Sequence, residues 1–254
     1  MRVFLTGASS GLGEALAQRY ARQGATLGLF ARREAELARI AASLAPATVA
    51  TYPGDVRDPD VLAQAGADFI ARFGCPDVVI ANAGVSRGTL TDEPEDLPAF
   101  RAVFETNVLG MVYTFAPFVR PMREAGHGIL AGIASVAGFR GLPGSGAYCG
   151  SKSAAITYLE SLRVELRGTG VAVVTVCPGF IATPLTAKNP YRMPFLLTPA
   201  KAAMLTERAI ARRRAFYVLP WQMALVGKLL RCAPRALFDR AVAGRARKPR
   251  QPSS

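Results

Sequence analysis

Short runs of apolar residues alternate with amphipathic stretches along most of this chain, and this alternation limits the possible fold more than any other feature. Runs that are apolar throughout are typical of strands covered on both faces, as in a parallel sheet. Apolar residues at spacings of three and four predict helices between them. Strands are expected at 3–5, 25–31, 47–52, 77–81, 129–134, 171–177 and 216–219, and helices within 11–24, 33–44, 61–70, 97–123 and 147–167. The pattern predicts one doubly wound α/β domain over residues 1–220, with a parallel seven-stranded sheet and helices on both faces.

A glycine-rich turn, TGASSGLG at residues 6–13, lies directly between the first expected strand and the first expected helix. Its glycines let the backbone approach a ligand closely, and the helix that follows presents free N–H groups and the positive end of its dipole. A dinucleotide pyrophosphate fits such a site and makes the domain Rossmann-like. The alternative, a tight turn without a ligand, is disfavoured by its place at the first strand. The residues predicted to bind are Gly7, Ser9, Ser10, Gly11, Leu12 and Gly13.

The end of the second expected strand favours NADP(H) over NAD(H). An acidic residue there would hydrogen-bond the ribose 2′-hydroxyl of NAD, but this strand ends in Arg32 and Arg33. A guanidinium can bind a 2′-phosphate through two hydrogen bonds, so we expect Arg32 to do so, assisted by Ser9 or Arg33. Alternatively, both arginines begin a solvated helix. Cofactor contacts are also expected after the third and fourth strands, from Asp55 and Val56 at the adenine and from Asn82, Ala83 and Gly84 at the ribose.

Tyr148 and Lys152 are four residues apart at the start of an expected helix, so they share one face. A tyrosine hydroxyl has an ordinary pKa of about 10, and a nearby ammonium favours its ionised form. Tyrosine placed in this way can act as a general acid or base on a carbonyl or an alcohol. Ser135 follows the strand at 129–134 and could orient the substrate oxygen, and Asn107 could bridge a water molecule to the lysine.

The joint order of these motifs resembles that of the short-chain dehydrogenase/reductase superfamily, from residue 3 to about residue 183. The resemblance rests on TGASSGLG, DVRD (55–58), ANAG (81–84), ETNVLG (105–110), IASVAG (133–138), YCGSK (148–152) and CPGFIAT (177–183). It implies that Asn107, Ser135, Tyr148 and Lys152 form the active site and that Lys152 also holds the nicotinamide ribose. It further implies nicotinamide contacts from Pro178, Gly179, Ile181 and Thr183. Ala81 departs from the family, in which many members have a second asparagine at this place.

The resemblance implies hydride transfer between a nicotinamide and a carbonyl or secondary alcohol, with Tyr148 handling the proton. NADPH-dependent reduction is the favoured interpretation, and an NAD-linked alcohol dehydrogenase is the alternative within the class. A regulator that binds NADPH without turnover is the alternative from another class, which an intact set of catalytic residues disfavours. The family commonly forms homodimers or homotetramers through the helices around Asn107 and Tyr148.

Residues 183–200 are rich in Pro, Met, Phe, Leu and Tyr, which predicts a lid over the substrate. The lid could equally pack on its own core. A lipophilic ketone or alcohol is the expected substrate. The residues expected around it are Ser135, Phe139, Leu142, Met193 and Phe195, together with Ile181.

Residues 221–254 are predicted to form basic amphipathic helices with a disordered end. From Lys201 onward the chain has 13 Lys or Arg residues and two acids. Such helices can lie on an anionic membrane or contact a second subunit. Nucleic acid binding is disfavoured, because the sequence has no motif typical of it.

Four scattered cysteines and a single histidine predict neither a metal site nor a disulfide framework. Reduced cysteines suit a cytoplasmic protein, and the basic helices would allow it to sit on the inner face of a membrane. No stretch of 18 apolar residues appears, so no membrane-spanning helix is expected.

Overall fold

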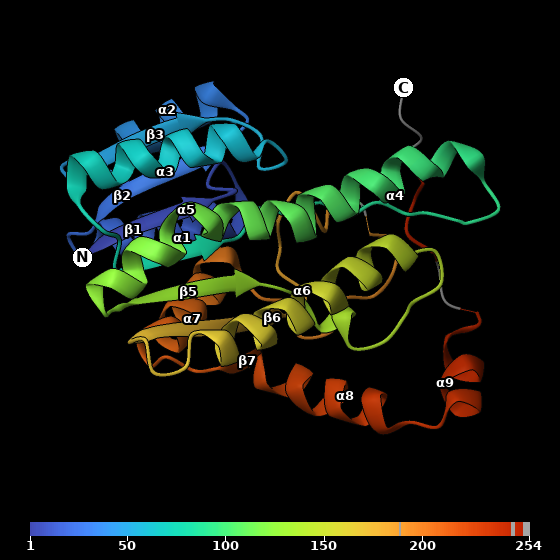
Figure 1. Cartoon of the computed structure of the whole chain (residues 1–254). Coiled ribbons are helices and arrows are strands. Elements are labelled where there is room, and N and C mark those ends of the chain that lie inside the picture. Colours follow the sequence, from blue (N-terminus) through green and yellow to red (C-terminus); the bar gives the residue numbers. More distant parts are fainter. Residues whose placement is uncertain (188, 245–246, 251–254) are drawn as a thin grey trace.

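The computed structural model describes residues 1–187, 189–244 and 247–250. Seven parallel strands form one sheet in the order β3-β2-β1-β4-β5-β6-β7 (Figure 1). Their bounds are β1 Arg2–Thr6, β2 Thr26–Ala31, β3 Val49–Pro53, β4 Val78–Ala81, β5 Gly128–Ile133, β6 Val171–Pro178 and β7 Phe216–Leu219. The order reverses between β1 and β4, which places a ligand crevice at the carboxyl ends of these two strands. The predicted fold class and the seven strands are confirmed.

Helices cover both faces of the sheet, as the alternation predicts. Their bounds are α1 Gly11–Ala21, α2 Glu34–Ser43, α3 Pro59–Phe73, α4 Leu97–Phe104, α5 Gly110–Ala125, α6 Gly146–Glu165, α7 Pro199–Ala211, α8 Trp221–Cys232 and α9 Arg235–Val242. Shorter turns are η1 Pro94–Asp96, the π-helical η2 Glu105–Leu109, and η3 Val136–Gly138. The sequence did not predict α7, although Thr198 caps its first turn and Pro199 begins it, both typical of a helix start.

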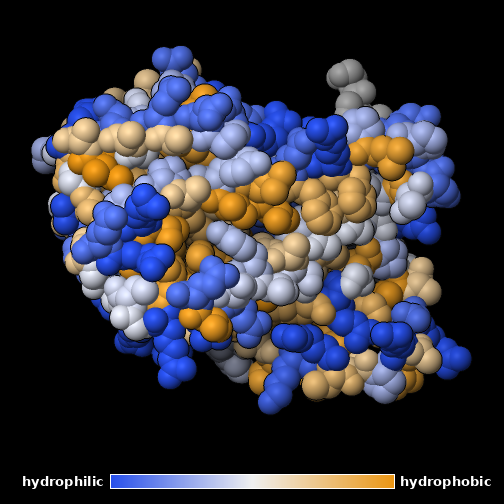
Figure 2. All heavy atoms as spheres, viewed as in Figure 1, coloured by the Kyte–Doolittle hydropathy of each residue, from blue (hydrophilic) through white to orange (hydrophobic). Residues whose placement is uncertain are grey.

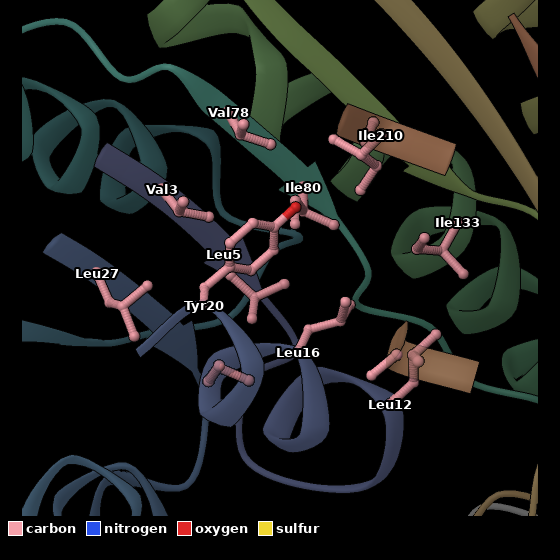
Figure 3. Packing of buried hydrophobic residues seen from close by; sticks show 14 of the residues in the cluster. Val3, Leu5, Leu12, Leu16, Tyr20, Leu27, Val78, Ile80, Ile133 and Ile210 are labelled. Atoms are coloured by element: carbon pink, nitrogen blue, oxygen red, sulfur yellow. The ribbon is translucent and has the colours of Figure 1, made fainter. Parts of the chain in front are cut away.

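Alternate residues of each strand point to opposite faces, so two apolar layers form. In β1, Val3 and Leu5 pack with α1, α2 and α7, whereas Phe4 packs with α3, α5 and α6. Figure 3 shows the first layer, in which Leu16 and Tyr20 of α1 lie over Leu5. The apolar side chains at the centre of both layers are fully buried. This packing holds the strands in place, and with them the loops that follow the strand ends.

The segment from Pro94 to Ala125 is one continuous helical stretch, long and apolar enough by composition to cross a membrane. A helix within 97–123 is expected from the sequence, but not one apolar enough to cross a membrane. In the structure it is a half-buried core helix, because Phe115, Phe118 and Met122 are fully buried against the sheet. The π-helical turn η2 interrupts it at the residues nearest the crevice.

The C-terminal segment folds back over the domain instead of extending away from it. Helix α8 follows β7 directly and packs against η3, and α9 lies beyond it (Figure 1). Residues 247–250 then run beside the start of α4, where Arg250 pairs with Gly88 in an isolated parallel bridge. The disordered end predicted by the sequence falls partly on residues 245–246 and 251–254, which lie outside the described residues.

Candidate active site

A cavity of about 310 Å³ opens at the carboxyl ends of the central strands. Almost every residue predicted to bind the cofactor lines it: Gly7, Ser9, Ser10, Gly11, Leu12, Arg32, Arg33, Asp55, Val56, Asn82, Ala83, Gly84, Tyr148, Lys152, Pro178, Gly179, Ile181 and Thr183. Gly13 is the exception, since it lies behind the wall. The alternation of strands and turns thus brings residues far apart in the sequence to one site.

The glycine-rich turn forms the floor of this cavity. Gly7 and Gly11 have φ angles of 67° and 60°, a left-handed conformation that glycine adopts without strain. A Cβ at Gly13 would collide with the carbonyl oxygen of Gly7, so Gly13 allows the helix to approach the turn. The side-chain nitrogen of Asn82 donates to the carbonyl oxygens of Thr6 and Gly7 at 3.2 and 3.1 Å, which ties the turn to β4. Free N–H groups of α1 therefore face the cavity on a rigid support.

Arginine side chains border the cavity where β2 ends. The Arg33 guanidinium donates to the carbonyl oxygen of Ser9 at 2.9 Å and to its hydroxyl at 3.0 Å. Arg32 lines the same cavity and is exposed. Two guanidinium groups thus flank the place where a ribose 2′-substituent would lie, and the structure gives Arg33 the direct contact with Ser9.

Asp55, predicted to lie at the adenine, is paired with Arg57 at 2.7 Å. Burial alone would raise the pKa of Asp55, but hydrogen bonds from the Arg57 side chain and backbone outweigh it and leave the pKa lowered. The carboxylate is therefore favoured in its charged form at the rim of the cavity, where both of its oxygens accept hydrogen bonds from Arg57.

Tyr148 and Lys152 lie one turn apart on α6, and the Lys152 Nζ is 6.0 Å from the centre of the Tyr148 ring. Lys152 is 4% exposed, and its Nζ donates to the carbonyl oxygen of Ile133 at 2.8 Å. Burial lowers the pKa of Lys152 to about 8. Burial also raises the pKa of Tyr148 to about 12, opposed by a hydrogen bond with Ser135. In the ligand-free protein burial thus outweighs the lowering of the tyrosine pKa that the sequence predicted.

Ser135 caps the short turn η3 at the end of β5. Its hydroxyl oxygen accepts from the Ala137 N–H at 3.1 Å and the hydroxyl donates to the Pro178 carbonyl oxygen at 3.5 Å. These bonds hold the hydroxyl beside Tyr148 at the wall shared by two cavities. A carbonyl oxygen placed there could accept hydrogen bonds from both hydroxyl groups.

Asn107 is fully buried in the π-helical turn η2. Its side chain exchanges hydrogen bonds with both backbone groups of Val85 and donates to the Ser151 hydroxyl at 2.9 Å. The side chain therefore fixes the segment after β4 and helix α6, and its predicted water bridge to Lys152 stays a prediction.

A second cavity of about 190 Å³ adjoins the first at Ser135, Tyr148 and Gly179. Of the predicted substrate residues, Ser135 and Leu142 line it. The loop predicted to form the lid lines this cavity through Leu185, Thr186, Asn189, Tyr191 and Pro194. Other lining residues were not predicted: Phe180, Met223, Val226, Gly227, Leu230 and Lys248, with Ser86 and Arg140. Only the amphipathic pattern of α8 could have indicated that it packs here.

Four residues expected around the substrate need correction, because none of them lines this cavity. Ile181 lines the first cavity instead. Phe139 turns away to stack on Phe216 at 6.1 Å between ring centres and packs against Gly227. Met193 and Phe195 lie in the loop predicted to form the lid; Met193 accepts from the Asn189 amide at 3.5 Å, and Phe195 is 47% exposed. Residues of helix α8 and other residues of the predicted lid loop line the cavity instead of these side chains.

The described residues hold no group of three or more His, Cys, Asp or Glu side chains that could bind a metal ion. The four cysteines are free thiols.

Comparisons with known proteins agree with this geometry. A family model described as short chain dehydrogenase matches residues 1–193. An uncharacterized oxidoreductase of Myxococcus xanthus is 40% identical over 93% of this chain and 94% of its own length. The 11-beta-hydroxysteroid dehydrogenase 1A of Arabidopsis thaliana is 37% identical over 72% of this chain, and the match covers only 53% of the plant protein.

Two solved structures share the fold and hold nicotinamide cofactors. A short-chain dehydrogenase/reductase of Burkholderia phymatum in complex with NAD has a TM-score of 0.82 at 26% identity, covering 100% of this chain and 96% of that one. An alcohol dehydrogenase of Thermococcus sibiricus, complexed with 5-hydroxy-NADP, has a TM-score of 0.77 at 28% identity, covering 86% and 95%. The chain is an oxidoreductase that belongs to the short-chain dehydrogenase/reductase superfamily.

Proposed function

We propose that this enzyme reduces a lipophilic ketone with NADPH, with Tyr148 as the general acid. The observation that carries the proposal is the meeting of two cavities at Tyr148 and Ser135, one floored by the glycine-rich turn and one lined mainly by apolar side chains. A dinucleotide in the first cavity and a carbonyl compound in the second would touch at these two hydroxyl groups. The residues of the first cavity fit a dinucleotide, since Gly7 and Gly13 leave room beside the helix N-terminus.

A bound nicotinamide would supply the hydride, and the side chains supply position and the proton. Ser135 and Tyr148 hold the carbonyl oxygen, and the Tyr148 hydroxyl gives its proton to that oxygen as negative charge develops on it. Because burial raises the pKa of Tyr148 to about 12, the hydroxyl is protonated at neutral pH and can donate the proton that reduction of a carbonyl requires. Lys152, held by the Ile133 carbonyl, is placed to favour the phenolate that remains.

The preference for NADPH rests on the two arginines after β2. A 2′-phosphate beside Ser9 would pair with Arg33 and Arg32, whereas the described rim of the cavity at this point offers no carboxylate directly after β2 for a ribose 2′-hydroxyl. The test is ketone-dependent loss of nicotinamide absorbance with each cofactor. We expect kcat/KM to be higher with NADPH, and a clear preference for NADH would refute this part of the proposal.

We propose that the outer face of α4, α5 and α6 binds a second copy of the chain. Leu97, Phe100, Leu109 and Val164 are exposed there, and Figure 2 shows hydrophobic side chains gathered over these helices. Burying such a patch is the usual role of a subunit interface. Sedimentation analysis should give a dimer or tetramer, and Leu109→Glu should shift it toward monomer. A monomeric wild type would refute the proposal.

We propose peripheral contact of α8 with the cytoplasmic, anionic face of a membrane. Trp221, Leu225 and Leu229 project outward from one face, beside exposed Lys228 and Arg231. Apolar side chains with a basic border suit an anionic bilayer surface. Removing α8 by truncating the chain after Leu219 would not test membrane contact cleanly, because α8 also forms part of the wall of the second cavity. Leu225→Gln with Leu229→Gln should instead reduce pelleting with phosphatidylglycerol vesicles; equal pelleting would refute the membrane contact.

A further inference from the structure

The described end of the chain, residues 247–250, forms a strap along one side of the second cavity. Arg250 anchors it by ion pairs of 2.8 Å with Asp96 and 2.8 Å with Glu93. Asp96 is 1% exposed, and hydrogen bonds from the Leu90 N–H and then from Arg250 hold its pKa below the ordinary value. The strap is therefore fixed to the protein by a buried carboxylate.

The packing of the strap leaves no space at Gly88. A Cβ at this residue would collide with the carbonyl oxygen of Lys248 and would lie 2.7 Å from that of Pro249. The close approach of the strap backbone to Gly88 and the ion pairs of Arg250 together restrict where the Lys248 side chain can point.

Lys248 is the strap residue that enters the cavity. Its Nζ donates to the Ser86 hydroxyl at 2.7 Å and lies 5.9 Å from the centre of the Tyr148 ring. The end of the chain thus brings an ammonium group to the substrate side of Tyr148, at nearly the same distance from the ring as Lys152 at 6.0 Å.

The charge of Lys248 has no carboxylate partner among the described residues that line this cavity. Arg140 is the other cation of the wall, and its guanidinium is engaged by the carbonyl oxygens of Leu230 and Ala233 at 3.0 and 3.1 Å and lies over Phe238. Burial lowers the pKa of Lys248, as expected for an ammonium removed from water without a counter-charge. None of the described lining residues supplies a negative charge to this wall, and an anionic ligand would supply one.

We infer that Lys248 is a substrate-binding residue that selects carbonyl compounds bearing a carboxylate, with Ser86 as the second donor to that group. The inference rests on the proposed reduction of a ketone and narrows it to oxo acids. Tyr148 and Ser135 would hold the ketone oxygen, and the apolar body would lie against Leu142, Val226 and Leu230. The carboxylate would replace water around the ammonium by a charge-assisted hydrogen bond.

The test compares an oxo acid with its neutral ester, using benzoylpropionate and its methyl ester. Calorimetry on the NADP⁺-loaded protein measures binding, and loss of NADPH absorbance measures turnover. We expect the wild type to favour the acid about 10- to 100-fold in affinity and KM, the range expected for a hydrogen bond to a charged group. Lys248→Met should lose that preference, because its KM for the acid should rise. Its kcat for the acid, and its kcat and KM for the ester, should stay close to the wild-type values. Lys248→Arg should retain most of the preference.

Lys201→Met is the matched control, since Lys201 is exposed on α7 and does not line the cavity. It should behave as the wild type. Equal binding of acid and ester by the wild type, or an equal loss for both ligands in Lys248→Met, would overturn the role of Lys248. Tighter binding of the acid without turnover of either compound would support the role of Lys248 while contradicting the proposed reduction of ketones.

Discussion

Replacing Lys152 with methionine should make the ligand-free protein more stable while it abolishes turnover. The ammonium is 4% exposed, and no ion pair to it occurs among the described residues. Burial lowers its pKa from 10.5 to about 8. At 1.36 kcal/mol per pKa unit, keeping this charge inside the protein costs about 3 kcal/mol. Removing the charge therefore stabilises the fold, but losing the hydrogen bond to the Ile133 carbonyl destabilises it by about 1–2 kcal/mol. The net expectation is about 1–2 kcal/mol of added stability near neutral pH.

The pH dependence separates the charge from the packing. A lysine whose pKa is lower in the folded protein than in the unfolded chain destabilises the fold fully below the folded pKa. That cost disappears as the pH rises from about 8 to about 10.5, because the unfolded chain then loses the same proton. The free energy of unfolding is measured by urea denaturation without cofactor at about pH 7 and about pH 10. Between the two pH values, the difference in unfolding free energy should move by about 2–3 kcal/mol in favour of the wild type, so that Lys152→Met becomes the less stable protein near pH 10.

Other titrating groups are common to both proteins, so they cancel in this difference. Lys228→Met controls for the loss of a lysine from an exposed position. If the stability difference between Lys152→Met and the wild type were the same at both pH values, Lys152 would not be a strained charge. If Lys152→Met were less stable near neutral pH, the hydrogen bond to Ile133 would outweigh the cost of burial.

Tyr148→Phe should reduce kcat/KM about 100- to 10,000-fold while NADPH binding, followed by fluorescence, stays near the wild-type value. Arg33→Gln should raise the KM for NADPH about tenfold or more and leave that for NADH nearly unchanged; equal effects on both would exclude contact with the 2′-phosphate. Gly13→Ala should weaken binding of both cofactors in the same titration, because its Cβ would collide with the Gly7 carbonyl oxygen. Arg250→Met should weaken the discrimination between oxo acid and ester without changing turnover of the ester, since it releases the strap from Asp96.

The sheet and the cofactor side of the site could be predicted because their signals are local in the sequence. A parallel strand buried on both faces must be apolar throughout, so β4, β5 and β6 are visible as apolar runs. The carboxyl ends of such strands share one edge, which brings the glycine-rich turn, Asn82 and Ser135 to one cavity. The positions of Tyr148 and Lys152 relative to each other could be predicted from the helical repeat alone.

The substrate side could not be predicted, because long-range packing determines it. Phe139, Met193 and Phe195 have the apolar character of a substrate pocket, yet the cavity is lined by residues of helix α8 and by other residues of the loop predicted to form the lid. The chain returns more than 150 residues in sequence to pair Lys248 with Ser86. A composition of 13 basic residues after position 200 indicates a charged tail, and nothing in it indicates that one lysine turns inward.

Two ammonium groups thus lie at similar distances from the Tyr148 ring: Lys152, which is buried and lines the first cavity, and Lys248, which is half-buried and lines the second. Neither has an acidic partner among the described residues, and burial lowers the pKa of both. Burial without a counter-charge costs free energy in the ligand-free protein. A dinucleotide would bring its phosphates into the first cavity, and an oxo acid would bring its carboxylate into the second. Near the tyrosine, the charged side chains described in these cavities are the cations Lys152 and Lys248. The unpaired charges of Lys152 and Lys248 that destabilise the ligand-free protein would then favour binding of the dinucleotide and of the oxo acid. Both ligands would meet at the Tyr148 hydroxyl, the group that transfers the proton.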